Sequence, residues 1–465
     1  MSNLTPLKSV AVRQAMKWVA LLAPHLPDDL ILSLLKPQIS YIKYADGIDF
    51  VNSVVLQAKR YFAKASEVCR NRMAVKLFAN YSILSGEKRD DFTAREGVDA
   101  PLLYVISPTM RCNLNCYGCY SANYNKNDDL DFETIDRIIT EGKEYGIYFV
   151  VVSGGEPFIR DDILKIFEKH NDVFFQVFTN STQISKKKLT KNIAELGNVL
   201  PCISVEGLEK ETDERRGKGT FRTIVSVMED LRERGVAYGF SVTATRSNSE
   251  FIVSDEFIDF FADKGCFLGW YFNYMPIGRN PDVDLMPTPE QRNYRRKRII
   301  EMRKTKPIAL ADFWNDGTSV GGCISGRVYL HINNKGDVEP CVFSQFSVDN
   351  IKGKALCEVW KSPFFNELRE RQLGMKNRLR PCMIIDRPNV LREVVSHACA
   401  RPTQQGGEAT LTKLASALDE YAKKYAEIAE DAWEKEYGEE REIKKEENSA
   451  SESGKVIMEA ENKGF

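Results

Sequence analysis

The sequence predicts an α/β protein built around a central parallel β-sheet. Between residues 101 and 280, six short apolar runs alternate with segments of helical periodicity, an order typical of successive βα units. Such units form either an open, doubly wound sheet or a partial barrel. Residues 8–85 instead have the amphipathic periodicity of helices, and a hairpin pattern follows near residue 330. The sheet should therefore be flanked by two regions of different construction.

The composition suits a chain of two or three folded domains without a general affinity for nucleic acid. The 465 residues include 65 basic and 66 acidic side chains, so the net charge is close to zero. Pro24 and His25 interrupt the first apolar run, so we expect no signal peptide, no transmembrane helix and a cytoplasmic location. The eleven cysteines should be reduced there and serve as metal or cluster ligands rather than form disulfides.

The N-terminal helices are expected to pack on the central sheet. Their clearest segments are LPDDLILSLLK and FVNSVVLQAKRYFAKASEV, whose apolar residues fall on one face of a helix. Peripheral contact with a membrane surface is the alternative role for such amphipathic helices.

The unusual residues of the central region follow the expected strands, which are LLYVIS, YFVVVS, FFQVFT, LPCISV, YGFSVT and GWYFNYM. In parallel sheets of either kind, the active site lies in the loops after the carboxyl ends of the strands. One mouth should therefore collect the residues of these loops: Cys112, Cys116, Cys119, Gly154, Gly155, Glu156, Thr179, Asn180, Ser204, Glu206, Thr243, Ile277, Gly278 and Arg279.

The stretch RCNLNCYGCY, residues 111–120, contains three thiols. A structural zinc site needs four protein ligands, usually as two short pairs, so this trio fits zinc poorly. A four-iron cluster held by three thiolates keeps one iron open for a ligand that is not protein. Gly154 and Gly155 would let such a ligand approach the backbone closely, because no Cβ stands in the way.

A second group of cysteines follows near residue 320. GGCISGRVYLHINNKGDVEPC predicts a hairpin whose turn is NNKGD. Its Cys323 and Cys341, together with Cys382 and Cys399, could hold a second cluster or a zinc ion. Cys357 is placed in a short helix after the hairpin and is not counted among the ligands. The remaining cysteines lie singly in apolar segments and are expected to be buried packing residues: Cys69, Cys202 and Cys266.

Two further helices are expected toward the C-terminus. Thr288-Pro289-Glu290-Gln291 is a capping signature for a helix over residues 288–305, whose basic residues predict a solvated face, with anion or acidic-lipid binding as the alternative. From residue 408, apolar residues at spacings of three and four predict a seam that packs on the body or on another subunit. Beyond Tyr437 the chain is charged and Ser-rich, which indicates disorder.

C-x3-C-x2-C after the first expected strand, followed by GGEP after the second, closely resembles the radical S-adenosylmethionine (SAM) enzymes over about residues 98–280. The resemblance implies a partial (β/α)6 TIM-like barrel with an N-terminal helical subdomain and a small α+β C-terminal iron-sulfur region. It also implies a [4Fe-4S] cluster on Cys112, Cys116 and Cys119, with SAM at the open iron. In that family, one electron from the cluster cleaves SAM, and the resulting 5′-deoxyadenosyl radical abstracts hydrogen from a substrate carbon.

The same resemblance implies a SAM pocket. Residues 154–156 would contact the methionine amino group, Ser204 and Glu206 the ribose or methionine end, and Ile277 and Gly278 the adenine. The remaining wall residues would be Thr179, Asn180 and Thr243.

One position departs from the family pattern. An aromatic residue usually precedes the third cysteine directly, whereas Gly118 stands here, with Tyr117 and Tyr120 on either side. The departure concerns the adenine contact at this loop and not the cluster, because cluster assembly depends on the thiols.

Cys323 followed by Gly336-x4-Cys341 resembles the opening of the C-terminal extensions called SPASM or twitch domains, which bind auxiliary iron-sulfur clusters. The later C-x2-C-x5-C-x3-C segment of a full SPASM domain is absent. The resemblance therefore implies a shortened version with one auxiliary [4Fe-4S] cluster on Cys323, Cys341, Cys382 and Cys399. The expected domains are an N-terminal helical subdomain, a radical SAM core, the auxiliary cluster region, and a helix with a disordered charged tail: residues 1–97, 98–305, 306–407 and 408–465.

Three functions fit the sequence. The first is radical modification of a peptide or protein, because SPASM-type extensions often accompany such enzymes. The second is radical modification of a lipid or isoprenoid at a membrane surface, which the N-terminal helices suggest. The third and most remote is a non-enzymatic iron-sulfur or zinc binding module.

For the two enzymatic candidates, the reaction could be of the oxidoreductase or the C–C or C–S bond-forming type. The expected partners are SAM, the substrate and a flavodoxin- or ferredoxin-type electron donor, with no nucleic acid.

Overall fold

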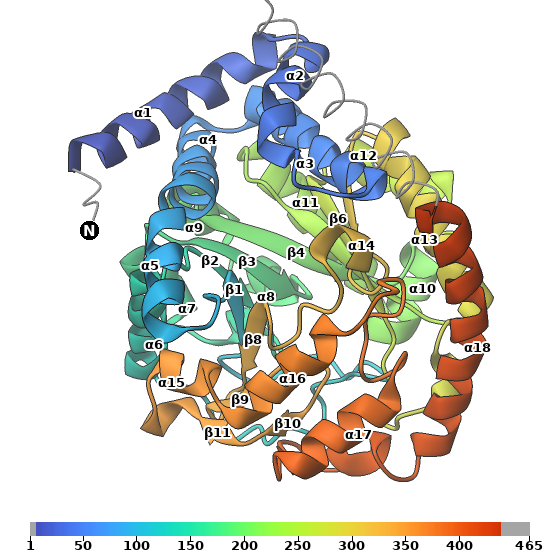
Figure 1. Ribbon diagram of the computed structural model, residues 1–465. Coiled ribbons are helices and arrows are strands. Elements are labelled where there is room, and N and C mark those ends of the chain that lie inside the picture. The colour runs from blue at the N-terminus through green and yellow to red at the C-terminus, as the bar shows by residue number, and fades with distance from the viewer. Residues whose placement is uncertain (1–5, 439–465) are drawn as a thin grey trace, which may run out of the picture.

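The computed structural model describes residues 6–438, and its centre is a mostly parallel sheet (Figure 1). The strand order is β11-β9-β8-β1-β2-β3-β4-β5-β6-β7. The six expected strands are all present, and each pairs in parallel with the next along the chain. They are β1 (Leu103–Ile106), β2 (Phe149–Val152), β3 (Phe174–Thr179), β4 (Val199–Val205), β5 (Gly239–Ala244) and β6 (Leu268–Asn273). The expected α/β class is confirmed.

The helices that follow the strands have apolar faces, and some of them also have a side-chain cap at the start. Asp131 accepts a hydrogen bond from the Thr134 backbone N–H at the start of α6, and Ser254 does the same for Phe257 at α12. The buried side of α6 carries Ile135, Ile138 and Ile139, among others. The helices of this region are α6 (Phe132–Glu144), α7 (Ile163–Lys169), α8 (Thr182–Lys186), α9 (Thr190–Leu196), α10 (Glu209–Arg216), α11 (Thr220–Glu233), α12 (Asp255–Lys264) and α13 (Pro289–Thr305).

The N-terminal helices cover the end of the sheet at which the strands begin. Phe62 shares an apolar cluster with Phe174 at the start of β3, Leu200 near the start of β4, and Phe267 just before β6. The expected packing of these helices on the sheet is therefore observed. The elements are α1 (Pro6–Leu22), α2 (Asp28–Ile39), α3 (Ala45–Lys64), α4 (Glu67–Met73), a π-helical segment η2 (Ala74–Leu84) and α5 (Gly86–Glu96).

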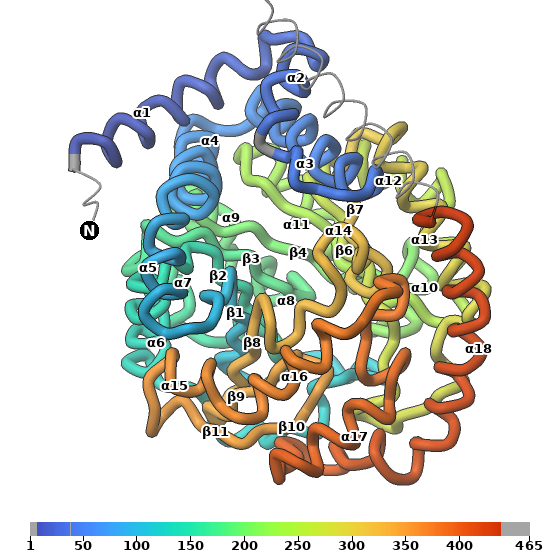
Figure 2. The backbone as a smooth tube through the Cα atoms, in the orientation of Figure 1, coloured from blue at the N-terminus to red at the C-terminus, as the bar shows by residue number. Residues whose placement is uncertain are grey.

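The C-terminal region extends the same sheet and adds a small antiparallel sheet of two strands, β10 and β12. The expected hairpin is present, and its first strand pairs in parallel with β1. Figure 2 shows the following helices packed around this extension, at the opposite end of the molecule from α1. The elements are β7 (Ala309–Asp312), α14 (Gly317–Val320), β8 (Tyr329–Ile332), β9 (Asp337–Glu339), β10 (Phe346–Ser347), β11 (Asp349–Asn350), α15 (Leu356–Trp360), α16 (Pro363–Leu373), α17 (Pro388–His397), β12 (Arg401–Pro402) and α18 (Ala415–Trp433).

The expected solvated basic face of the helix over residues 288–305 is wrong. Thr288 and Gln291 form the expected capping box. Four arginines of α13 are nevertheless buried, because each donates to a carboxylate brought from elsewhere in the chain: Arg292 to Asp386, Arg295 to Asp312, Arg296 to Glu436 and Arg303 to Asp316. These pairs hold the helix against its neighbours, so they leave no broad basic surface for an anion or a lipid.

The expected apolar seam near the C-terminus packs on the body. Leu418 and Tyr425 of α18 are buried, and the Arg292 guanidinium stacks on the Tyr425 ring at 3.8 Å from its centre. The tail expected to be disordered lies outside the described residues. Within residues 6–438, no helix is both long enough and apolar enough to cross a bilayer.

Candidate active site

The three clustered cysteines line one cavity of about 260 Å³ at the carboxyl ends of the strands. Cys112, Cys116 and Cys119 are each partly buried in the loop after β1. The Leu114 backbone N–H lies 3.5 Å from the Cys112 sulfur, and the Asn180 side-chain nitrogen lies 3.8 Å from it. Burial raises the pKa of Cys112 to about 11, so a bound cation is needed to hold the thiolate at neutral pH.

Glycines allow the loops of this cavity to pack closely. A Cβ on Gly155 would stand 2.2 Å from the Arg111 carbonyl oxygen, and one on Gly154 would stand 2.4 Å from that of Thr109. Gly154 also has a φ of +116°, in the region that favours glycine. The GG pair therefore lies directly against the loop that carries the cysteines.

Glu156 faces away from the cavity, unlike its expected role. Its carboxylate accepts hydrogen bonds from the backbone N–H groups of Phe158 and Asn180 and from the Thr179 hydroxyl. Burial raises the pKa of this carboxyl to about 7. The side chain therefore ties the loop after β2 to the loop after β3, whereas Ser153, Gly154 and Gly155 of the first loop line the cavity.

Glu206 is likewise occupied by protein groups. Arg215 and Arg216 of α10 donate to its two oxygens at 2.6 and 2.5 Å. Both guanidinium groups line the cavity, whereas Glu206 does not. Two positive charges held by one carboxylate leave a net positive charge at the wall beside Cys116. The sequence signal that could have identified this pair is the motif DERR, which begins seven residues after Glu206 and ends in the two arginines.

Of the other residues expected in the SAM pocket, some line the first cavity and some lie behind the cysteine loop. Thr179, Asn180, Ser204 and Thr243 line the cavity. Ile277 and Gly278 do not line it. Instead, a Cβ on Gly278 would meet the Cys119 carbonyl oxygen at 2.2 Å, so this segment supports the cysteine loop from behind. The Arg279 backbone N–H donates to the same oxygen.

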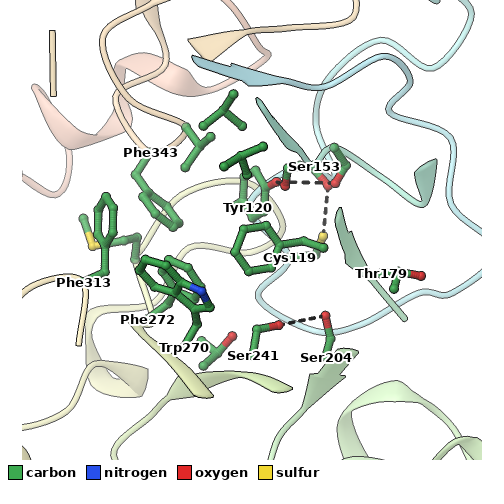
Figure 3. A pocket seen from close by; sticks show the side chains of 18 of the residues that line it. Cys119, Tyr120, Ser153, Thr179, Ser204, Ser241, Trp270, Phe272, Phe313 and Phe343 are labelled. Atoms are coloured by element: carbon green, nitrogen blue, oxygen red, sulfur yellow. Dashed lines mark hydrogen bonds between the residues drawn. The ribbon is translucent and has the colours of Figure 1, made fainter. Parts of the chain in front are cut away.

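A group of aromatic side chains, which the sequence analysis did not identify, forms the opposite wall of the cavity (Figure 3). Trp270 and Phe272 come from β6 and stack at 6.0 Å between ring centres. Phe313 and Phe343 continue the wall from the C-terminal region, and Tyr120 of the cysteine loop contacts Phe343. We call Trp270, Phe272, Phe313 and Phe343 the aromatic wall. The cavity is thus polar near the cysteines and apolar beyond them.

Three of the four cysteines expected to bind the auxiliary cluster line a second cavity of about 150 Å³. Cys323, Cys341 and Cys382 line it, and it shares Trp270, Phe313 and Phe343 of the aromatic wall with the first cavity. Cys399 is exposed at the end of α17 and lines a different hollow with Arg392 and Ser396. The structure therefore brings together three of the expected ligands and leaves Cys399 apart.

The other cysteines lie as expected. Cys357 is in α15, where it contacts Tyr145 rather than the second cavity. Cys69, Cys202 and Cys266 are buried in the apolar core. Within residues 6–438, no three His, Cys, Asp or Glu side chains converge on one ion-sized point. The thiolates of a four-iron cluster bind different irons and need not converge in this way.

A buried network of side-chain hydrogen bonds joins the C-terminal hairpin to the core beside the first cavity. His331 of β8 contacts the Ser107 hydroxyl at 2.7 Å and the Glu339 carboxylate at 2.6 Å. Tyr124 donates to the same carboxylate at 2.8 Å. All four side chains are buried, so this network connects the two parts of the sheet rather than facing a substrate.

The sheet, the cysteine loop and the adjacent glycines define a class of proteins that bind a cluster and a ligand at the mouth of a partial barrel. Comparison with known families supports this: residues 106–248 match the radical SAM superfamily, and residues 323–383 match SPASM, an iron-sulfur cluster-binding domain. Both matches lie within the expected core and auxiliary regions, whose boundaries remain predictions.

Known proteins give the same result. Mycofactocin maturase MftC of Mycolicibacterium smegmatis is 30% identical over 295 residues, which are 59% of this chain and 74% of the relative. Pre-heme d1 synthase of Dinoroseobacter shibae is 24% identical over 62% of this chain and 80% of the relative. The chain belongs to the radical SAM superfamily, and it binds a [4Fe-4S] cluster with SAM and an auxiliary iron-sulfur cluster.

The fold has solved counterparts. Streptococcus suis SuiB bound to S-adenosylmethionine matches with a TM-score of 0.54 and 20% identity, over 64% of this chain and 75% of that one. SuiB bound to its precursor peptide SuiA matches with a TM-score of 0.52 and 20% identity, over 65% and 72% of the two chains. These likenesses establish the shared fold.

Proposed function

We propose that Cys112, Cys116 and Cys119 hold the SAM-cleaving cluster. The observation that carries this proposal is that all three thiols line one cavity together with the glycine pair. The residues present fit the group: the thiols are the only cysteines lining that cavity among residues 6–438, and their sulfurs can each reach a different iron. When bound, the reduced cluster and SAM supply an organic radical able to remove hydrogen from an unactivated carbon.

The chain's own residues then position SAM and exclude water. Gly154 and Gly155 line the cavity beside the cysteines, and because neither carries a Cβ, the cysteine loop can lie directly against the wall that would hold the methionine end. The net positive wall of Arg215 and Arg216 suits a carboxylate. Ser204, with Thr179, Asn180 and Thr243, supplies hydroxyl and amide groups for the remaining polar atoms. Glu156, Glu206, Ile277 and Gly278 act in this proposal as supports of the pocket rather than as its ligands.

The auxiliary cluster is proposed to bind Cys323, Cys341 and Cys382. Their side chains line one cavity, whereas Cys399 faces elsewhere, so the expectation of Cys399 as fourth ligand has no geometric support. Trp270, Phe313 and Phe343 separate the two cavities. Electrons could cross this short apolar layer without water reaching either site.

A peptide or protein is the first proposed substrate. Support comes from the relative named a mycofactocin maturase and from the fold likeness to SuiB, which binds a precursor peptide. The reaction would begin with removal of hydrogen from a side-chain carbon that enters between the cysteine loop and the aromatic wall. Oxidation or C–C or C–S bond formation would follow, and a flavodoxin- or ferredoxin-type protein would supply the electron.

An apolar hydrocarbon chain, of a lipid or an isoprenoid, is the second candidate. Beyond the cysteines, the aromatic wall presents four large rings, and its polar atom is the indole nitrogen of Trp270. Such a wall suits a substrate that is recognised by shape and apolar contact. No relative reported above favours this candidate.

The first experiment measures 5′-deoxyadenosine. The anaerobically reconstituted protein, reduced with dithionite, should release it from SAM, and absence of release from a protein with full iron content would contradict the cluster assignment.

The second experiment finds the substrate class. Peptide and lipid extracts of producing cells grown in deuterated medium are added separately, and mass spectrometry shows which extract transfers deuterium to 5′-deoxyadenosine.

A further inference from the structure

Helix α1 presents an apolar face to solvent. It extends from the body at the edge of the molecule, above α4 (Figure 1). Trp18 is 55% exposed and Leu7 is 81% exposed. The spacing from Leu7 to Val10 and from Trp18 to Leu21 places these side chains along one stripe of the helix. The exposed apolar residues of this face are Leu7, Val10, Trp18, Leu21 and Leu22.

The fold fixes which side of α1 faces outward. Ala20 is buried in an apolar cluster with Phe62, Met73 and Ala74, so the opposite side of the helix packs on the N-terminal helices. Turning the stripe inward would therefore expose Ala20 and break this packing. The exposed face is a permanent feature of the folded chain rather than a helix end that could refold against the body.

Basic side chains border the apolar face. Arg13 and Lys17 lie on α1, and Arg72 and Lys76 lie on the helices beneath it. Lys76 is close enough to interact with the other three cations and with the Asp172 carboxylate. None of these four forms an ion pair with a carboxylate among residues 6–438. Arg13 donates only to the side-chain oxygen of Asn80. The four cations outnumber the Asp172 carboxylate near Lys76, which is also paired with Lys143, so the border of the face carries a net positive charge.

The charges decide between the candidate occupants of this face. A second copy of the chain would bring its own four cations against these four, and like charges across an interface are unfavourable. An anionic bilayer offers both an apolar interior for the stripe and negative headgroups for its border. Trp18 suits such a boundary, since one side of indole is apolar and its N–H is polar.

We propose that α1 lies in the headgroup layer of an anionic membrane, with its apolar face toward the acyl chains and Arg13, Lys17, Arg72 and Lys76 against the phosphates. This contact anchors the enzyme through its N-terminal helices and is independent of the substrate class proposed above. It differs from the basic surface expected at residues 288–305, whose arginines are buried.

Sedimentation with vesicles tests the contact. The full-length, cluster-loaded protein should sediment with vesicles of phosphatidylcholine and phosphatidylglycerol, weakly with phosphatidylcholine alone, and less as salt screens the charges. Trp18→Ser with Leu21→Ser should abolish sedimentation. Leu373→Ser, at a more exposed apolar residue on α16, should not alter it. Lys17→Gln should weaken binding about fivefold, which corresponds to about 1 kcal/mol per basic residue near an anionic surface.

Fluorescence shows whether α1 itself enters the membrane. Trp18 is the only exposed tryptophan of the five in the chain. Brominated lipids should therefore quench part of the emission, and Trp18→Phe should sediment normally but lose that quenching. Iron content equal to wild type would show that each variant is folded.

Several results would overturn the proposal. These are no sedimentation of folded wild-type protein at low salt, equal sedimentation of the Trp18/Leu21 variant, or binding without quenching of Trp18. A dimer that the Trp18/Leu21 variant dissociates, in the absence of vesicle binding, would assign the face to a second copy instead. If the variants that no longer bind vesicles still form 5′-deoxyadenosine, membrane binding and SAM cleavage are independent properties of the protein.

Discussion

Two adjacent glycines set the distance between the cysteine loop and the loop after β2. The Cβ positions of Gly154 and Gly155 are already filled by carbonyl oxygens of residues 109 and 111. Any larger side chain must push the cysteine loop away from the wall that would hold SAM. The effect on activity should therefore exceed the effect on overall stability.

Gly155→Ala tests this distance. Its Cβ would stand 2.2 Å from backbone that cannot move without shifting Cys112, so we expect 5′-deoxyadenosine formation to be lost. The stability cost should be about 1–3 kcal/mol, as for overpacking elsewhere. The matched control is Gly353→Ala, whose Cβ would meet no atom within 4 Å. Activity of Gly155→Ala equal to that of the control would show that the two loops need not touch.

The cysteines themselves give the second prediction. Cys112→Ala should abolish reductive SAM cleavage, because two thiolates cannot hold the cluster in this geometry. Cys202→Ala removes a buried thiol in β4 that lines neither cavity and should leave cleavage and iron content unchanged. The rate of 5′-deoxyadenosine release, normalised to iron, is the measurement. Cleavage that survives in Cys112→Ala would remove this residue from the ligand set.

Helix α13 shows how a charged element can become part of the core. The Arg292 guanidinium and the Asp386 carboxylate have no exposed side-chain surface and lie 2.5 Å apart. Asp386 also accepts from the Cys382 backbone N–H. The helix is thereby linked to a proposed ligand of the auxiliary cluster.

Arg292→Met should destabilise the fold by about 3–5 kcal/mol, since it leaves a buried carboxylate without its partner. Arg292→Lys retains the charge but loses the bidentate contact and the stacking on Tyr425, so its cost should be intermediate. Lys297→Ala, on the exposed side of the same helix, should change stability by less than about 0.5 kcal/mol. Urea midpoints followed by circular dichroism provide the comparison, and equal midpoints for Arg292→Met and Lys297→Ala would refute the structural role of the pair.

The elements that sequence reasoning identified are those with local signals. Six strands were predicted because each is an apolar run between turn residues, and α13 because its cap lies within four residues. The burial of its arginines was not predictable, since their partners come from as far away as Glu436. The same holds for the site. The three cysteines lie within residues 112–119 and the two glycines are consecutive, so each motif is a local signal. The orientation of Glu156 instead depends on donors from the loop after the next strand.

The second cysteine group shows the same limit. Spacing could suggest Cys399 as a ligand, but the path of α17 carries it to the surface. The aromatic wall was also missed, because Trp270, Phe313 and Phe343 meet only after the C-terminal region has packed on the sheet. Long-range packing, and not local preference, decides these positions.

At the scale of the whole molecule, two cavities lie on either side of the aromatic wall. Iron content tests whether both are cluster sites. The reconstituted wild type should hold about eight irons, and the Cys112/Cys116/Cys119 triple alanine variant about four, at four irons per cluster.

Cys382→Ala and Cys399→Ala form a matched pair for the second site. The first should lose about four irons and the second none, because only Cys382 lines the second cavity. Iron loss in Cys399→Ala would restore that residue as a ligand. If the triple variant contains zinc rather than iron, the second cavity holds a structural zinc site instead of an iron-sulfur cluster.

The pairing of β1 with β8 has a consequence for synthesis. Ser107 and His331, which seal this junction, are 224 residues apart. At about 5–20 residues per second, a ribosome needs roughly 10–45 s to supply the second partner after the first. During that interval the open edge of β1 can pair with another chain. The nascent protein should therefore depend on chaperones, and the cysteine loop beside that edge should receive its iron only after β8 has been synthesised and has paired with β1.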